Sequence, residues 1–151
     1  MASHRNPCDG WPLISDAVVD YYNRPKLAYS YIKRVQQDRC VMVDEAENEQ
    51  RKVIAVNDTL SDAKIDVAIS VIGQPDTLLK HTLTAPANGR AEVGEVPTSL
   101  VCALYLLNWR TNASTGRNHY LAGPRLFNLE QYTQWIPQLE LEEGTSAFEP
   151  A

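Results

Sequence analysis

The sequence predicts a mainly β protein, an antiparallel β-sandwich of the immunoglobulin type, preceded by a helical segment. Short runs rich in β-branched residues fill the chain from residue 39 onward, and they alternate apolar and polar residues with a period of two. Turn signals separate these runs at intervals of roughly 8 to 14 residues, as in sandwiches of this type. Ahead of Gln36 the apolar spacing is three to four residues, which is typical of a helix. The change of period divides the chain into a helical front and a β-rich remainder.

Length and charge narrow the function classes. The chain has 151 residues, enough to bury a core, and a formal net charge of -5. Binding to nucleic-acid phosphates needs a basic stripe, and the sequence has none. No apolar run approaches the roughly 20 residues that cross a bilayer. We therefore expect neither nucleic acid nor a membrane as a partner.

The front helix is expected to begin near Asn23 and to end at about Gln36. Asn23 can cap the helix, and Pro25 is tolerated in the first turn because an early helical N–H lacks an intrahelical partner. The segment from Trp11 to Ile14 is expected to be extended. The apolar side of the helix consists of two neighbouring rows, Leu27, Tyr31, Arg34 and Ala28, Ile32, Val35.

The first predicted strands form a hairpin. Residues 40–43 and 52–56 are its two strands, and the acidic segment from Asp44 to Gln50 is the loop between them. Residues 65–71 show the clearest alternation, which predicts a strand with one buried face. Residues 79–83 repeat that pattern, and the turn residues 86–89 follow it. Residues 92–96 form a further short strand.

The last predicted strands complete the sandwich. Residues 100–109 are apolar on both sides except for Asn108, so they should form a central strand covered on both faces. A turn over 111–116 leads to the returning strand 118–121. A closing amphipathic helix is expected to carry Phe127, Tyr132, Trp135 and Ile136, and an acidic tail follows Pro137.

The sequence shows no catalytic, metal or cofactor motif. The three histidines, His4, His81 and His119, are not at a spacing that zinc sites use, and His81 is expected on the inward face of a strand. A glycine-rich phosphate loop and a G-x-S-x-G motif are both missing. We predict no catalytic residue, no metal and no cofactor. The cysteines, Cys8, Cys40 and Cys102, are odd in number, which leaves one disulfide plus a free thiol open, and Cys102 is predicted to be buried.

The residues with the clearest chemical potential are Asp9 and Trp11. An indole beside a carboxylate is common in sugar-binding sites, because the ring stacks on a pyranose and the acid accepts hydroxyl hydrogen bonds. The alternative is that Trp11 packs against the helix as part of the core. Four tyrosines nearby are more typical of an interdomain packing surface than of a ligand platform: Tyr21, Tyr22, Tyr29 and Tyr31.

Several short stretches, most of them in the front segment, carry a resemblance to a known family. They are Trp11-Pro12, Val19-Asp20-Tyr21-Tyr22, Arg24-Pro25-Lys26, Ala28-Tyr29 and Lys33-Arg34, and farther on Val56-Asn57-Asp58, Asn118-His119-Tyr120-Leu121 and residues 127–132 with Trp135. Together they resemble the β-mannosidase-like branch of the family-two glycoside hydrolases. In that family such a front stretch is the last strand, loop and helix of the catalytic (β/α)8 barrel, and it leads into an immunoglobulin-like sandwich. Relatives tend to have an asparagine-aspartate pair before the Trp-Pro. This chain has Cys8-Asp9-Gly10, so only Asp9 can be the counterpart.

The resemblance implies a division of the chain and a role. Residues 1–36 would be the barrel remnant, 37–137 the sandwich with its closing helix, and 138–151 an acidic tail. The family's acid/base and nucleophile glutamates lie on earlier barrel strands, so the chain would be a non-catalytic C-terminal accessory domain of a retaining glycosidase. Asp9 and Trp11 would bind substrate only in the intact enzyme. The expected partners are the rest of the parent glycosidase, or a second copy of the chain bound through the front helix.

A stand-alone immunoglobulin-like binding or interaction module is the alternative. The apolar side of the front helix distinguishes the two. In an orphaned barrel helix, Leu27, Tyr31 and their neighbours should be exposed or should pair two copies of the chain. In a stand-alone module the sandwich should cover them.

Overall fold

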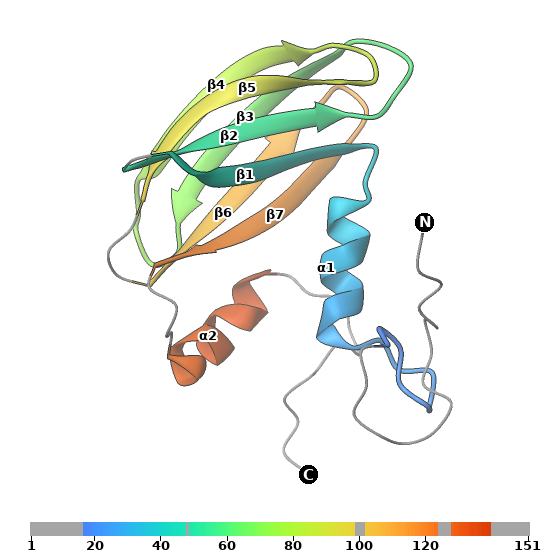
Figure 1. Cartoon of the computed structure of the whole chain (residues 1–151), viewed down its shortest axis with the longest axis vertical. Helices are drawn as coiled ribbons and strands as arrows, with labels where there is room; N and C mark the ends of the chain where they lie inside the picture. Colours follow the sequence, from blue (N-terminus) through green and yellow to red (C-terminus); the bar gives the residue numbers. More distant parts are fainter. Residues whose placement is uncertain (1–16, 48, 99–101, 124–127, 140–151) are drawn as a thin grey trace.

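Seven antiparallel strands form two packed sheets, with two helices at one end of the sandwich (Figure 1). The structure is a computed structural model that describes residues 17–47, 49–98, 102–123 and 128–139. The elements in chain order are α1 (Leu27–Val35), β1 (Arg39–Glu47), β2 (Gln50–Asn57), β3 (Ala63–Val71), β4 (Thr77–Ala85), β5 (Gly89–Pro97), β6 (Ala103–Arg110), β7 (Thr115–Ala122), α2 (Leu129–Trp135) and the 3-10 helix η1 (Ile136–Leu139).

The strand order confirms the predicted sandwich. One sheet has the order β1-β2-β5 and the other β4-β3-β6-β7, so the chain changes sheets after β2, β4 and β5. Immunoglobulin constant domains pair the fourth strand with the fifth, whereas here β4 pairs with β3. The architecture is that of an immunoglobulin-like sandwich with a three-stranded and a four-stranded sheet.

The core lies between the sheets and follows the period of two. On β3, Ile65, Val67 and Ile69 are almost completely buried, as the alternation predicted. On β6, the Trp109 indole lies over Gly116 of β7, and an added Cβ at Gly116 would come within 2.3 Å of the ring. A glycine at this position therefore leaves room for the largest side chain of the core.

A second apolar cluster covers the outer face of the four-stranded sheet. Ile72, Leu104 and Leu139 are its buried members, and Trp135 packs against them. Leu104 and Leu106 of β6 thus pack in this outer cluster, while alternate residues of the strand pack between the sheets. This confirms that the first half of β6 is covered on both faces and that a closing helix is present, whereas Asn108 and Arg110 line an open part of the outer face. Leu139 is fully buried, although the expected acidic tail included it.

The start of the front helix was predicted wrongly. Its N-terminal cap is Lys26, which makes no side-chain capping bond, and Asn23 has a φ of 61° in the loop before it. Val19 and Pro25 form an isolated antiparallel bridge, so the preceding residues make a tight hairpin-like loop instead of a first helical turn. The helix ends where the sequence indicated, with Gln36 as its C-terminal cap.

Two smaller expectations were also wrong, and a third was right only in part. The hairpin of β1 and β2 is present, but the two strands extend to Glu47 and back from Gln50, so the acidic segment is largely strand. His81 lies opposite the buried Val67 and thus on the inward face, as expected, but β4 is an edge strand and the side chain is exposed. Cys102 is only partly buried. Cys40 is the buried cysteine, and neither it nor Cys102 is in a disulfide.

Candidate functional site

The predicted substrate-binding residues, Asp9 and Trp11, lie outside the described residues. Their role stays a prediction. The structure describes three other groups of side chains. The first is the loop of residues 19–25, here called the Asp20 loop. The second is the contact between α1 and β7, and the third is a hollow on the four-stranded sheet.

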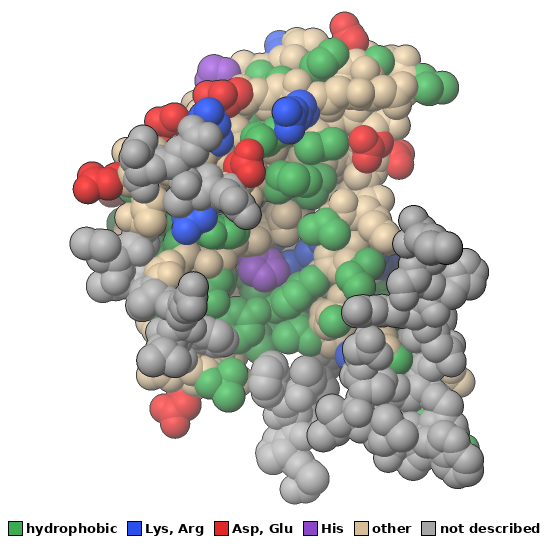
Figure 2. All heavy atoms as spheres, viewed as in Figure 1, with side chains coloured by type: hydrophobic (Ala, Val, Ile, Leu, Met, Phe, Trp, Pro, Cys, Tyr) green, Lys and Arg blue, Asp and Glu red, His purple; other side chains and the backbone are tan. Residues whose placement is uncertain are grey.

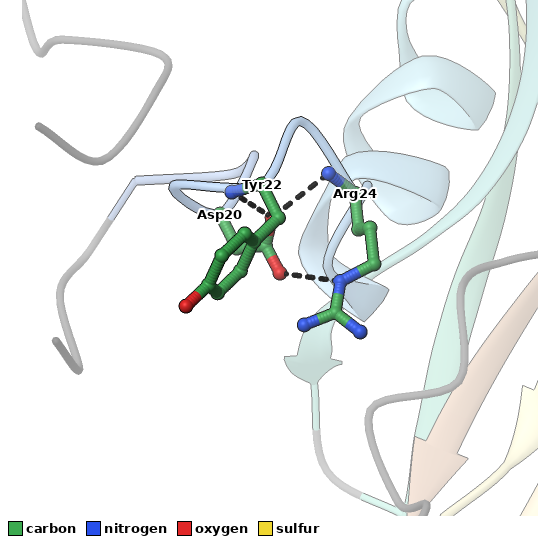
Figure 3. Close-up of polar contacts among 3 residues, drawn as sticks. All are labelled: Asp20, Tyr22 and Arg24. Carbon is green, nitrogen blue, oxygen red and sulfur yellow. Dashed lines mark hydrogen bonds and ion pairs between the residues drawn. The ribbon is translucent and has the colours of Figure 1, made fainter. Parts of the chain in front are cut away.

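Asp20 organises the loop before α1 (Figure 3). One carboxylate oxygen accepts hydrogen bonds from the backbone N–H groups of Tyr22 and Arg24, both at 2.8 Å. The other oxygen accepts a bond from Arg24 Nε at 2.9 Å. The backbone N–H of Arg24, its guanidinium and the N–H of Tyr22 hold the pKa of Asp20 below its ordinary value. The carboxylate is therefore ionised at neutral pH and fixes the shape of the loop.

The Asp20 loop displays two tyrosines on the surface. The rings of Tyr21 and Tyr22 meet edge to face with centroids 5.3 Å apart, and the guanidinium of Arg24 lies 5.3 Å from the Tyr22 centroid. Both tyrosines are exposed. The two exposed rings form an apolar patch on a loop that Asp20 holds by hydrogen bonds. Their role in interdomain packing stays a prediction.

α1 contacts the sandwich through one of its two apolar rows. The Tyr31 ring lies 4.7 Å from the His119 ring of β7, and the Tyr31 hydroxyl is hydrogen-bonded to the Tyr132 hydroxyl of α2. Arg34 donates a hydrogen bond to the backbone carbonyl of Leu139. These contacts join residues about a hundred positions apart and fix α1 to β7, α2 and η1. On the face in Figure 2, apolar side chains gather where the sandwich meets the two helices, while charged ones lie over the strands above.

His119 is neutral in this contact. Burial, and then the positive charge of Arg34, lower the pKa of His119 to about 4. Its Nδ1 atom is buried and has no hydrogen-bond partner among the described residues. A neutral imidazole with a pKa this low is a poor base at neutral pH.

The hollow lies on the outer face of the four-stranded sheet, beside the cover formed by α1 and η1. Its volume is about 540 Å³, within the range of small-molecule sites. Its floor is a row of directly opposed residues that crosses all four strands: Lys80 of β4, Ala68 of β3, Asn108 of β6 and Arg117 of β7. The small Ala68 side chain in the middle of this row, between longer ones, creates the depression.

The next row supplies a further charged pair. Asp66 of β3 lies opposite Arg110 of β6, whose guanidinium is 3.2 Å from the carboxylate. Thr82 also donates a hydrogen bond to Asp66, and these two contacts hold the pKa of Asp66 below its ordinary value. Arg34 lines the hollow from α1. Among the described lining residues, four are cationic, and Asp66 is the one acid.

The hollow was not predicted from the sequence, because its residues come from four strands and are not near one another in the chain. Only the strand register places them side by side. A signal existed in the alternation itself: Asp66, Ala68, Asn108 and Arg117 all occupy outward positions of their strands. Without the pairing partners these positions could not be joined into one site.

The described residues hold no group of three or more His, Cys, Asp or Glu side chains that could bind a metal ion, and no helix long and apolar enough to cross a membrane. Two matches to the N-x-S/T glycosylation pattern, at Asn57 and Asn112, differ in setting. Asn112 is exposed, whereas Asn57 is fully buried and its amide nitrogen donates to the carbonyls of Ser61, Ala85 and Pro86. A glycan on Asn57 is incompatible with this fold.

Comparison with known proteins gives a structural relative. The crystal structure of a β-D-mannosidase from Dictyoglomus thermophilum matches 78% of this chain with 28% sequence identity and a TM-score of 0.60. The chain spans only 15% of the length of that protein. No family model and no curated protein sequence matches the chain. The structural match supports a relationship to a β-mannosidase and hence to the glycoside hydrolases.

Proposed function

We propose that this chain is the C-terminal accessory domain of a β-mannosidase-like family-two glycoside hydrolase. The observation that carries the proposal is the match to the Dictyoglomus thermophilum β-D-mannosidase, which covers most of this chain but a small part of that protein. The parent would hydrolyse terminal β-glycosidic bonds with retention. In this proposal the domain supports the catalytic barrel, and Asp9 and Trp11 line the edge of the substrate pocket.

The exposed row of α1 supports a contact with the rest of the parent. Tyr31 and Arg34 contact the sandwich, but Ile32 and Val35 are 41% and 50% exposed, and Ala28 in the same row is also exposed. Residues spaced by three and four lie on one side of a helix, so these three form a continuous apolar stripe. Exposed apolar stripes mark interaction sites. The stripe and the tyrosines of the Asp20 loop would pack on the barrel.

Asp20 and Asp66, the two carboxylates held in ion pairs, do not have the properties of a catalytic pair. Retaining hydrolysis needs two carboxyl groups about 5 to 5.5 Å apart, one of them a proton donor with a raised pKa. Asp66 in the hollow and Asp20 in the loop instead have lowered pKa values and are held by arginines. Both are suited to structural ion pairs and unsuited to proton donation.

The sandwich covers only one of the two apolar rows of α1, and the accessory-domain and stand-alone alternatives differ in which rows should be covered. The sandwich covers the Tyr31 row, as expected for an independent module, and leaves the Ile32 row open, as expected for a barrel helix. The open row is the observation that favours the accessory domain.

The proposal is tested first on the natural gene and then on the two parts of the protein. We expect the reading frame upstream of residue 5 to encode several hundred residues with barrel strands that end in glutamate. That upstream part, expressed separately, should bind this chain and hydrolyse an aryl β-mannoside, while this chain alone should not. Ile32→Asp should weaken the association at least tenfold, and Leu60→Asp, at a loop position 90% exposed, should leave it unchanged.

A natural start codon at residue 5 would refute the accessory-domain role and leave the stand-alone module. Hydrolysis by the isolated chain that persists through further purification would contradict the non-catalytic role.

A further inference from the structure

We propose that the hollow on the four-stranded sheet is a binding site for a small ligand that carries a carboxylate or sulfate group. This inference does not depend on the proposed function, because it rests only on the residues of the hollow. The starting observation is the charge distribution. The whole chain has a formal net charge of -5, yet the described lining residues of this one depression include four cations and one acid.

The arrangement of the cations suits an anionic group. Lys80 and Arg117 lie at the two ends of the cross-strand row, three strand spacings or roughly 14 Å apart. Ala68 and Asn108 lie between them, so a ligand placed on the floor would have a positive charge on either side. Arg110 lies in the neighbouring cross-strand row, opposite Asp66, and Arg34 lines the hollow from α1.

The chemistry of the side chains adds specificity. Guanidinium groups bind carboxylate and sulfate oxygens through paired, charge-assisted hydrogen bonds. Asn108 Oδ1 accepts a bond from Arg117 Nε at 2.8 Å, which orients that guanidinium across the row. Asp66 offsets the charge of Arg110, with which it forms an ion pair, and it also accepts a hydrogen bond from Thr82. The described lining residues include three further cations, Lys80, Arg117 and Arg34, and no second acid. The hollow therefore combines a net positive charge with an amide that fixes one of the arginines.

The size of the ligand follows from the volume of the hollow. About 540 Å³ holds a single sugar or a small organic acid, and it does not hold a folded partner. An acidic monosaccharide or a di- or tricarboxylate has the matching charge and size. A neutral sugar lacks the charge that the four cations would bind.

The test is a titration of the full chain, followed by the backbone amide signals in NMR spectra at constant ionic strength. Citrate, inorganic sulfate, glucuronate and neutral mannose are the probes. We expect saturable shifts for the anions at Ala68, Asn108 and Arg117, and no shifts there with mannose. If sulfate binds and glucuronate does not, the ligand of the site is a free inorganic anion. If glucuronate binds, the ligand is an acidic sugar. Both outcomes support the site.

Three variants sharpen the result. Arg117→Gln should weaken citrate binding about tenfold, and Ala68→Phe should abolish it by filling the floor without changing any charge. Arg90→Gln removes one exposed arginine from β5, in the other sheet, and should have no effect. If Ala68→Phe does not fold, Arg117→Gln compared with Arg90→Gln decides. Equal weakening by these two, or shifts that spread over the basic residues without saturation, would overturn the proposal.

Discussion

The protonation of one largely buried side chain, His119, couples the contact between α1 and the sandwich to the pH of the solution. His119 lies against Tyr31 of α1, is largely buried, and faces the positive charge of Arg34. Tyr132 of α2 completes the group of titratable side chains at this contact. Tyr31 does not titrate in the same pH range as His119, because burial and the hydrogen bond to Tyr132 raise the pKa of Tyr31 far above its ordinary value.

The stability of the chain should fall as the pH is lowered from about 6.5 to about 4. His119 has an ordinary pKa of 6.5 and a folded pKa of about 4, so within this window the unfolded chain binds a proton at this residue and the folded chain does not. We expect a loss of ~1–3 kcal/mol in the free energy of unfolding. Urea unfolding measured across the window checks this.

His119→Phe should flatten the pH dependence, because the ring remains and the titrating group is gone. His81→Gln, at an exposed position on β4, is the matched control and should keep the dependence of the parent chain. An unchanged slope in His119→Phe would contradict the assignment. Asp20 and Asp66 also contribute to the pH dependence of stability, but their pKa values are lowered, so they become protonated only at a lower pH. Their contribution can therefore be separated from that of His119.

At the scale of elements, the two sides of α1 have different roles although both are apolar. Tyr31 is half-buried and contacts β7 and α2, whereas Ile32, the next residue, faces outward. A nine-residue helix is only marginally stable by itself in water. The stability of α1 therefore comes mainly from the packing of its buried side. The attachment of α1 should therefore depend on the Tyr31 side alone.

Tyr31→Ala should release α1 from the sandwich, and Ile32→Ala should not. We expect a loss of ~1–3 kcal/mol for Tyr31→Ala, from the ring contact and the hydroxyl bond, and a change within ~0.5 kcal/mol for Ile32→Ala. Hydrogen exchange of the α1 amides provides the measurement. Equal protection of the helix in both variants would show that α1 is held by other contacts.

Most of the strands could be predicted from the sequence, and the errors have local causes. Alternation on β3 placed Ile65, Val67 and Ile69 correctly, because one face of that strand is buried along its length. The helix start was missed because Asn23, a good capping residue, adopts a left-handed conformation in a loop that Asp20 stabilises. Which apolar row of α1 would be covered depends on β7 and α2, and the hollow depends on the register of four strands. Neither can be read from local spacing.

At the scale of the whole molecule, the exposed stripe of α1 is the surface that most needs a partner. When the rest of a parent protein is absent, the apolar side chains of Ile32 and Val35 remain in water. A second copy of the chain offers the same stripe, and a two-fold pair would bury both.

The isolated chain should therefore form a weak dimer. In sedimentation velocity runs over a range of concentrations, the average mass should rise toward twice that of the monomer. Ile32→Asp should hold the chain as a monomer, because a charge would be buried in the interface, and Leu60→Asp should dimerise like the parent chain. A monomer at every concentration would show that the stripe does not pair.

The contact between Arg34 and the Leu139 carbonyl has a geometric consequence for movement. It places the helix that leads into the sandwich next to the segment that leaves it, although the two are 105 residues apart. Arg34 and Leu139 both line the hollow on the four-stranded sheet. A movement of α1 away from η1 would therefore change the shape of the hollow while every strand pair stays intact.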